Sequence, residues 1–335
     1  MPSGKFSMFN NRRAAFLVLC LCCVRVVYGQ EFIKLPVSFG LGGSPVNACD
    51  FCLASQGISP LEVGASGVRI DLRYLHLGTP YREGTRISND DNELETHLTQ
   101  QYSIFYSLSS RFTLSGYIPV PYRHGERRGE DGSMIAGNQF GVGDVSLLLR
   151  YKPLMYHSME FTAMLSVAVG LKLPSGRTDG SDSQGALLDP HLQLGTGSTD
   201  LLLGTSGIIA WDNTALIANL LYGLAGPGAH GHRFGNNLNY DLALRIKVLP
   251  ADYAETQLFA TIGIDGEWRG EEVQNGERDE NSGGNVSYIS PGLQIFLGPS
   301  ISIEATYQYA VLHSLNGRQL GEDYRIVTGV QILFW

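Results

Sequence analysis

Apolar and polar residues alternate with a period of two over most of the chain from about Val63 onward, which is the pattern of β-strands with two unlike faces. The clearest stretch has one wholly apolar face, made of Leu238, Tyr240, Leu242, Leu244, Ile246 and Val248. Its other face carries Asn239, Asp241, Ala243, Arg245 and Lys247. The stretch from Ser300 to Val311 repeats the pattern, with Glu304 and Gln308 on the polar face.

This alternation predicts about twelve strands, an even number that suits a closed antiparallel barrel. They are expected near residues 64–77, 94–107, 111–120, 141–153, 158–172, 199–211, 214–224, 237–249, 255–266, 286–297, 300–312 and 323–335.

The connections between the predicted strands alternate in length. Short ones fall at 108–110, 153–157, 212–213, 250–254 and 298–299, and long polar ones at 78–93, 121–140, 173–198, 225–236, 267–285 and 313–322. A soluble β-sandwich would show the same alternation within each strand, but it has no reason to alternate short and long connections. Outer-membrane barrels do alternate them. The sequence therefore predicts an all-β fold, a transmembrane antiparallel up-and-down β-barrel with short periplasmic turns and long extracellular loops.

The first 29 residues have the features of a secretory signal peptide. Lys5, Arg12 and Arg13 give a basic start, an apolar run follows at 14–24, and Val27 and Gly29 are small residues before a cleavage point. The run is too short to anchor the chain, since a spanning helix needs roughly 20 apolar residues. We therefore expect a signal peptide at 1–29, a periplasmic or plug segment at 30–62, and a barrel at 63–335 in the outer membrane of a Gram-negative bacterium.

The charge of the exported chain argues against nucleic acid as a partner. The signal segment holds four of the 24 Lys and Arg residues and none of the 32 Asp and Glu residues, so 20 basic and 32 acidic residues remain. Nucleic-acid phosphates attract proteins of the opposite balance. Lipid of the outer membrane is the expected surrounding.

The chain ends in an aromatic residue, Trp335. Outer-membrane barrels commonly end in this way, and their assembly machinery binds that terminal strand. In the last predicted strand the apolar face runs through Tyr324, Ile326, Thr328, Val330, Ile332 and Phe334, which leaves Trp335 out of phase. Either a bulge shifts the register, or Phe334 and Trp335 share the role.

Three glycine-rich motifs lie in the middle of the chain: Gly141-Val142-Gly143-Asp144, Leu171-Lys172-Leu173-Pro174-Ser175-Gly176 and Leu194-Gly195-Thr196-Gly197-Ser198-Thr199-Asp200. In order and spacing they resemble a family of outer-membrane channels named for the meta pathway of phenol degradation. The resemblance implies passive passage of small molecules, including apolar or aromatic ones. It does not identify the solute.

Charged residues on the polar faces are candidates for the lining of the lumen. They are Arg69, Asp71, Arg73, Glu95, His97, Asp144, Arg150, Lys152, Glu160, Lys172, Asp241, Arg245, Lys247, Glu255 and Glu304. Such a wall could select solutes by charge and width, or it could consist of cross-strand ion pairs that fill a narrow barrel. The sequence does not decide between these two interpretations. A third possibility is that segment 30–62 folds into the lumen and closes it.

Cys49 and Cys52 are the two cysteines that remain after signal cleavage. A local disulfide in the oxidising periplasm is the leading interpretation. Metal binding would need two more ligands, and His76 and His97 are the nearest histidines. Haem attachment is disfavoured because Leu53, and not a histidine, follows Cys52. A redox or docking role beside a periplasmic cytochrome is the remaining interpretation.

The sequence as a whole favours an outer-membrane channel or uptake pore for small solutes, with no catalytic residue, metal or cofactor. One alternative is a barrel that sheaths a periplasmic cytochrome in an electron-conducting complex. Another is a barrel lipase, for which His313 and Ser314 would be the candidates. Adjacent residues of a strand point to opposite faces, which is poor geometry for a nucleophile and its base.

Overall fold

The computed structural model describes residues 65–128, 132–158, 160–249 and 256–334. Within these residues, twelve long antiparallel strands form one closed sheet. They are β1 (Ser66–Arg82), β3 (Leu94–Ser107), β4 (Phe112–Arg128), β6 (Ser146–His157), β7 (Phe161–Lys172), β8 (Asp200–Trp211), β9 (Thr214–Leu224), β11 (Asn237–Leu249), β12 (Thr256–Arg269), β15 (Gly284–Leu297), β16 (Ile301–Leu315) and β17 (Arg318–Phe334). The predicted twelve-stranded antiparallel barrel is confirmed.

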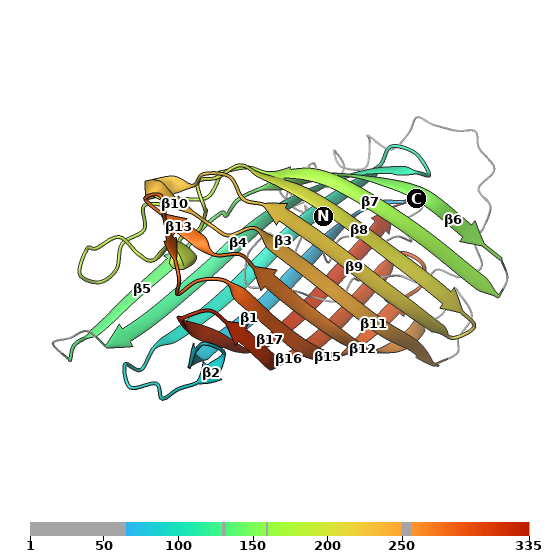
Figure 1. Ribbon diagram of the computed structural model, residues 1–335. Helices are drawn as coiled ribbons and strands as arrows, with labels where there is room; N and C mark the ends of the chain where they lie inside the picture. The colour runs from blue at the N-terminus through green and yellow to red at the C-terminus, as the bar shows by residue number, and fades with distance from the viewer. Residues whose placement is uncertain (1–64, 129–131, 159, 250–255, 335) are drawn as a thin grey trace, which may run out of the picture. The chain divides into compact units, whose positions relative to one another are not determined.

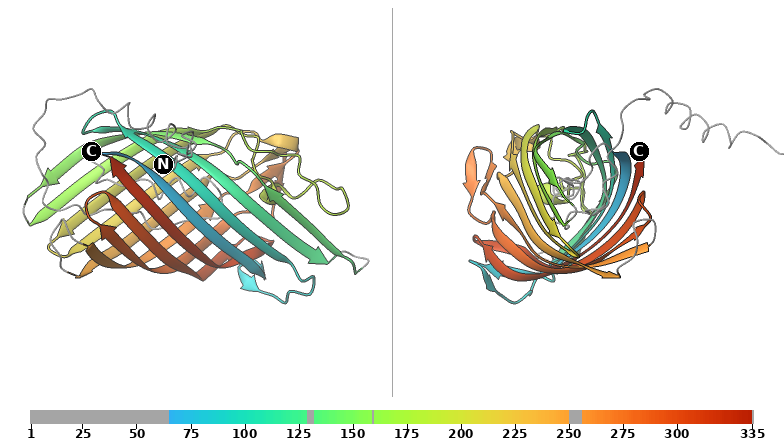
Figure 2. Two further views of the ribbon diagram at one scale, coloured as in Figure 1. Left: turned by 180° about the vertical axis from the view of Figure 1, so that it is seen from behind. Right: turned by 90° about the vertical axis from the view of Figure 1, so that its right-hand side faces the viewer.

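The barrel closes because its last strand pairs with its first, from Ser66 opposite Phe334 to Arg82 opposite Arg318 (Figure 1). Seen along its length, the sheet forms a ring (Figure 2). Closure leaves no unpaired edge, which a strand in lipid could not tolerate. The predicted signal peptide, the predicted segment 30–62 with Cys49 and Cys52, and the residues Glu255 and Trp335 lie outside the described residues.

Five short strands lie in the connections: β2 (Thr85–Arg86), β5 (Met134–Phe140), β10 (His232–Arg233), β13 (Glu272–Gln274) and β14 (Glu277–Asp279). The connections also contain two 3₁₀ turns, η3 (Pro190–Leu192) and η4 (Ala229–Gly231). Among the described residues, no helix has the length and apolar character needed to cross a bilayer.

Strands on the long-loop side run further than the alternation predicted. The segment expected to be a loop at 121–140 is largely the end of β4 paired with β5, and the expected loop at 313–322 shrinks to Asn316 and Gly317. Likewise β1 and β12 extend to Arg82 and Arg269, whereas β6 begins later than expected, at Ser146. The reason is that these ends stand in water, where neither face must be apolar, so the alternation fades while the backbone ladder continues.

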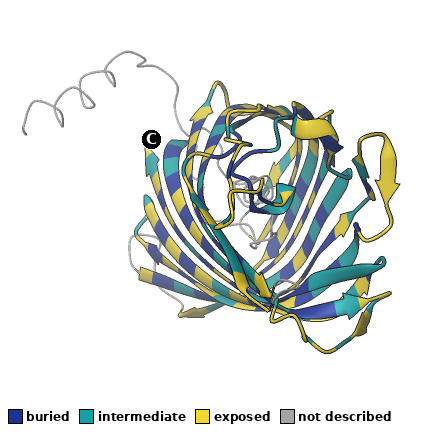
Figure 3. Cartoon of the chain, turned by 90° about the vertical axis from the view of Figure 1, so that its left-hand side faces the viewer, coloured by how far each residue is buried: buried dark blue, intermediate teal, exposed yellow. Residues whose placement is uncertain are grey.

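Burial alternates along each strand and appears as stripes around the barrel (Figure 3). Side chains that point outward are apolar and exposed: Ile264 keeps 59%, Leu242 49% and Ile326 43% of its surface accessible. Their inward neighbours are polar or charged and buried, as Asp265 and Arg325 show. A polar interior under an apolar exterior is the inverse of a soluble core, and it fits a barrel wall in contact with lipid.

Aromatic residues border this apolar belt at both ends. At the short-turn end Phe112 stacks on Tyr151 with ring centroids 4.9 Å apart. At the long-loop end Tyr307 stacks on Tyr324 with centroids 5.8 Å apart, and Trp268 is 42% exposed. Aromatic rings favour the boundary between lipid and water, and paired girdles mark the two interfaces of an outer-membrane barrel.

A charge on the outer face should weaken the barrel. Leu242 lies near the middle of β11 and is 49% exposed. We expect Leu242→Glu to lower the free energy of unfolding by about 1–2 kcal/mol, because a carboxylate at this depth loses its hydration. Urea titration of protein refolded into lipid vesicles measures the change. Leu187→Glu, at a 52% exposed position in the loop between β7 and β8, is the matched control; an equal loss there would contradict a lipid-facing position for Leu242.

Candidate functional site: the lumen and its extracellular entrance

Most of the predicted lumen residues lie on the inner side of the wall. Those that are buried are Arg69, Asp71, Arg73, His97, Asp144, Arg150, Lys152, Lys172, Asp241, Arg245 and Glu304. Glu95 and Lys247 are half-buried. Glu160 lies exposed in the turn before β7, outside the strands. Period-two alternation places a side chain correctly only inside a strand, and Glu160 precedes one.

An ion-pair group lies near the short-turn end of the lumen. The Arg69 guanidinium donates to Asp71 from Nε at 2.8 Å and also donates to Glu304. Asp71 and Glu304 stand on β1 and β16, on either side of Gly329 in β17. A Cβ at Gly329 would lie 2.6 Å from Arg69 Nη2. The glycine therefore provides the space in which this arginine joins the two carboxylates.

A second ion-pair group lies nearer the long-loop end. Arg325 donates from Nε to Glu322 at 2.7 Å and stacks over the ring of Tyr288, with its Cζ 4.3 Å from the ring centroid. Arg269 approaches the same Glu322 at 3.4 Å and Glu267 at 3.7 Å.

The sequence did not predict this second group. Glu267, Arg269 and Glu322 fall in segments that were expected to be loops, and Arg325 was not among the predicted lumen residues. The alternation from Asp265 through Glu267 to Arg269 was the signal that could have found the β12 residues.

The three glycine-rich motifs meet at one point of the wall. The Asp144 carboxylate accepts hydrogen bonds from Gly176 N at 2.9 Å and from Thr196 N at 2.8 Å. Lys172 Nζ lies 3.6 Å from Asp144 and 2.5 Å from Asp200. The charged residues of the motifs thus fasten both ends of the long connection between β7 and β8 to the start of β6.

Glycine is needed at this junction because backbones approach closely. A Cβ at Gly195 would lie 2.6 Å from both Asp144 Oδ1 and Gly176 Cα. The motifs are therefore a structural anchor of the loop at residues 173–199, and the sequence showed them only as turns.

The anchored loop folds onto the inner side of the β4–β5 hairpin. Leu188 and Leu192 are buried, and they occupy the space where Cβ atoms of Gly137 and Gly125 would lie, at 2.3 and 2.6 Å. Since Gly125 belongs to the inward row of β4, the loop covers part of the extracellular entrance from within.

Three loops are joined at this entrance by one carboxylate. Glu272, in β13, lies 3.0 Å from His191 Nε2 of η3 and 3.1 Å from His232 Nε2 of β10. Phe234 packs against both imidazoles, with ring centroids 5.3 Å from His191 and 4.6 Å from His232. We call Glu272, His191 and His232 the entrance latch.

The latch is charged over a wide pH range. The carboxylate of Glu272 raises the pKa of His191 to about 10. Burial opposes the protonation of His232, but hydrogen bonding and attraction to Glu272 outweigh it, so its pKa is also raised. Burial alone would raise the pKa of Glu272, yet the two histidines hold it well below its usual range. The three loops are thus held by ion pairs.

A cavity of about 540 Å³ lies between the latch, the inward loop and the barrel wall. Its charged lining includes Glu95, Arg123, Lys172, Glu267, Arg269 and Glu322. Within the described residues, no group of three or more His, Cys, Asp or Glu side chains is arranged to hold a metal ion.

The inner wall also has an apolar part, which the charged residues of the polar faces did not predict. Tyr117, Leu148, Ala168, Leu202 and Leu221 form one buried cluster on β4 and β6–β9. A second cluster includes Met164, Ile208, Ile217, Phe259 and Phe296, nearer the short-turn end. The inner wall therefore carries ion pairs on β1, β12, β16 and β17, and its apolar clusters extend from β4 through β6–β9 to β12 and β15. Arg150 and Lys152 of β6 and Lys172 of β7 are buried on the same inner side.

His313 and Ser314 do not form a catalytic pair. His313 points inward, stacks on Tyr81 with centroids 4.2 Å apart, and its Nε2 lies 2.7 Å from the carbonyl oxygen of Glu322. Ser314 is exposed, with a cross-strand partner in Asn285. The two side chains are on opposite faces of β16, as the alternation predicted.

A solved outer-membrane channel has a similar fold. The crystal structure of an outer membrane channel from Pseudomonas putida F1 aligns with a TM-score of 0.60 at 19% identity, over 81% of this chain and 96% of that one. The β domain of the Bordetella autotransporter BrkA aligns at 0.42 and 12% identity, over 81% of this chain and all of that one. The translocator domain of the autotransporter NalP from Neisseria meningitidis aligns at 0.40 and 14% identity, over 80% and 88%. No family model and no curated protein matches the sequence.

The closed barrel, its apolar belt and its aromatic girdles define the class of protein: a β-barrel of the bacterial outer membrane. Its fold is shared with the channel from Pseudomonas putida F1.

Proposed function

We propose that the protein is an outer-membrane channel for the passive passage of small solutes, with a preference for those that carry an apolar or aromatic part. The apolar clusters that lie beside the ion pairs of the inner wall carry the proposal. A wall of ion pairs alone would favour small ions. An apolar strip beside the ion pairs can contact the hydrocarbon part of a solute while the polar part of that solute stays hydrated. The resemblance of the three motifs to a channel family supports the same conclusion.

Flux into proteoliposomes tests the proposal. We expect a small aromatic alcohol to enter faster than a sugar of similar mass, and planar bilayers to show ion conductance. Leu202→Gln removes an apolar contact of the inner strip, because Leu202 is buried on β8. An apolar contact of about 1 kcal/mol corresponds to a several-fold change in partition, so the aromatic-to-sugar ratio should fall several-fold.

Leu201→Gln is the matched control, because Leu201 is the outward neighbour of Leu202 and is 38% exposed. This variant should keep the ratio of the wild type. Absence of both flux and conductance would refute the channel while leaving the barrel intact, and an unchanged ratio in Leu202→Gln would refute the preference alone.

A further inference from the structure

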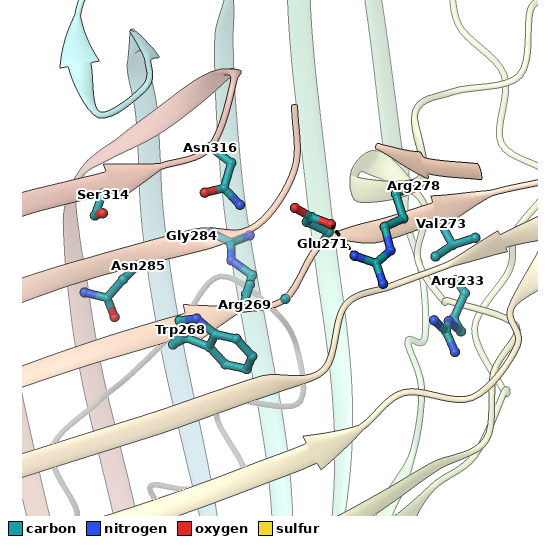
Figure 4. A pocket seen from close by; sticks show the side chains of 11 residues that line it. Arg233, Trp268, Arg269, Glu271, Val273, Arg278, Gly284, Asn285, Ser314 and Asn316 are labelled. Carbon is teal, nitrogen blue, oxygen red and sulfur yellow. Dashed lines mark hydrogen bonds and ion pairs between the residues drawn. The ribbon is translucent and has the colours of Figure 1, made fainter. Parts of the chain in front are cut away.

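A hollow of about 530 Å³ opens at the outer rim of the barrel, where β12, β15 and β16 meet the loops (Figure 4). Its lining includes Arg233, Arg269 and Arg278, together with Trp268, Asn285 and Asn316. The arginines come from three segments: β10, the end of β12 and β14. Three guanidinium groups around one hollow are notable in a chain whose exported part is strongly acidic.

The charges of the hollow are only partly neutralised within the protein. Arg269 has carboxylate partners on the lumen side, at Glu267 and Glu322. Arg278 approaches Glu271 at 3.5 Å, but its side chain is 81% exposed, and an exposed pair of this kind is weak. Arg233 is exposed and forms no ion pair with any residue that the structure describes. Two arginines are thus available to an external anion.

The floor of the hollow lies on the outer face of the barrel. Trp268 is opposite Asn285 in the ladder, and Asn285 is opposite Ser314, so the three side chains form a row across β12, β15 and β16. Tyr240 lies opposite Gly266, in a neighbouring row, and its hydroxyl donates to Asn285 at 3.2 Å. These polar groups accompany a partly exposed tryptophan, as at a lipid–water boundary.

The height of the row agrees with that boundary. Trp268 is the thirteenth residue of β12, and a strand rise of about 3.3 Å at a tilt near 45° puts it roughly 28 Å above the first residue of the strand. The apolar belt of an outer-membrane barrel is about 25 Å tall. The hollow therefore lies where the headgroups of the outer leaflet are found.

We infer that this hollow binds the phosphate-bearing headgroup of an outer-leaflet glycolipid, with Arg233 and Arg278 as the phosphate ligands. Arginine is suited to phosphate because its planar group presents parallel N–H donors. Trp268 would lie at the level where sugar and acyl chain meet, and Asn285, Ser314 and Asn316 would face the polar part of the headgroup. The inference is independent of solute passage.

Binding of diphosphorylated lipid A to the full-length protein in detergent micelles, measured by native mass spectrometry and by titration, tests the inference. We expect wild-type protein to bind it at least tenfold more tightly than its dephosphorylated form or phosphatidylethanolamine. Arg233→Ala/Arg278→Ala should lose most of this preference, at least tenfold, with unchanged ion conductance.

Arg82→Ala/Arg177→Ala is the matched control, because it removes two exposed arginines elsewhere on the long-loop side. Equal weakening in this control would show unspecific attraction and overturn the inference, and so would an unchanged double variant. Displacement of lipid A by inorganic phosphate at equal concentration would show a site for a free anion and would also overturn it. If the double variant does not assemble, Arg233→Gln/Arg278→Gln and the salt dependence of wild-type binding provide the same decision.

Discussion

Asp144→Ala is expected to release the loop at residues 173–199 from the barrel wall and to increase single-channel conductance several-fold. The Asp144 carboxylate accepts from two backbone amides and lies beside Lys172. Its removal leaves those part-buried donors unpaired, and Lys172 keeps the carboxylate of Asp200 and the hydroxyl groups of Thr196 and Ser198. Breaking a buried ionic contact of this kind costs about 3–5 kcal/mol. Because the loop covers part of the entrance from within, its release should widen the path.

The measurement combines conductance in planar bilayers with limited proteolysis of the loop. Asp179→Ala is the matched control, since Asp179 lies in the same loop and pairs with Arg177, with both side chains at least 66% exposed. This variant should keep the conductance and protease resistance of the wild type. Equal conductance in Asp144→Ala and wild type, with a protected loop, would contradict an anchoring role for Asp144.

The entrance latch should give the channel a conductance that is lowest at mildly acidic pH and rises toward alkaline pH. The pKa of His191 is raised from its ordinary value of 6.5 to about 10 by Glu272, with a smaller contribution from Asp189 and opposition from Arg269. A raised pKa means that the latched state holds the proton more tightly. Its stabilisation is therefore complete below about pH 6.5 and is lost as pH rises through about 10.

The contribution of Glu272 to the latch depends on pH in the opposite direction. Its pKa is held below the ordinary value of 4.5, so its contribution is present above about pH 4.5 and declines as pH falls below that. The latch should accordingly be strongest between about pH 4.5 and 6.5. Conductance recorded from pH 4 to 10 should show this minimum.

Glu272→Gln removes the charge that both histidines share. We expect the free energy that holds the three loops together to fall by about 2–4 kcal/mol, because charge-assisted contacts contribute about 1.5–3 kcal/mol each and the one with His191 is partly exposed. The variant should conduct more at pH 6 and lose the rise above pH 7. Glu271→Gln, one residue earlier and outside the latch, should keep the wild-type profile. A pH profile of Glu272→Gln identical to that of the wild type would assign the dependence to other groups of the lumen.

The class of the fold was predictable because a membrane barrel imposes two local constraints on its sequence. Every wall residue faces either lipid or lumen, which gives the period of two seen at Leu242 and Asp241. The connections must also be short turns at one end of the barrel and can be long loops at the other end, which gives the alternation of connection lengths. Where neither constraint acts, as in the long ends of β4 and β16, the predicted strands were too short.

The individual contacts of the lumen were not predictable. Alternation placed Arg69, Asp71 and Glu304 on the inner face. Their ion pairs depend in addition on Gly329, which lies on β17 between β1 and β16 and leaves space for the arginine. Glu272, His191 and His232 come from three loops without alternation, and nothing in their neighbourhoods along the chain connects them.

By itself, the sequence determined that the protein is an outer-membrane barrel, which strands build its wall and which residues face lipid. Only the tertiary structure decided that the three glycine-rich motifs form one anchor, that the longest loop folds inward, and that a single carboxylate joins three loops at the entrance. The physical reason is the sequence separation over which each feature is determined. The side of the wall to which a side chain points depends on that residue and its immediate neighbours. Ion pairs form between residues from distant parts of the chain, which closure of the barrel brings together.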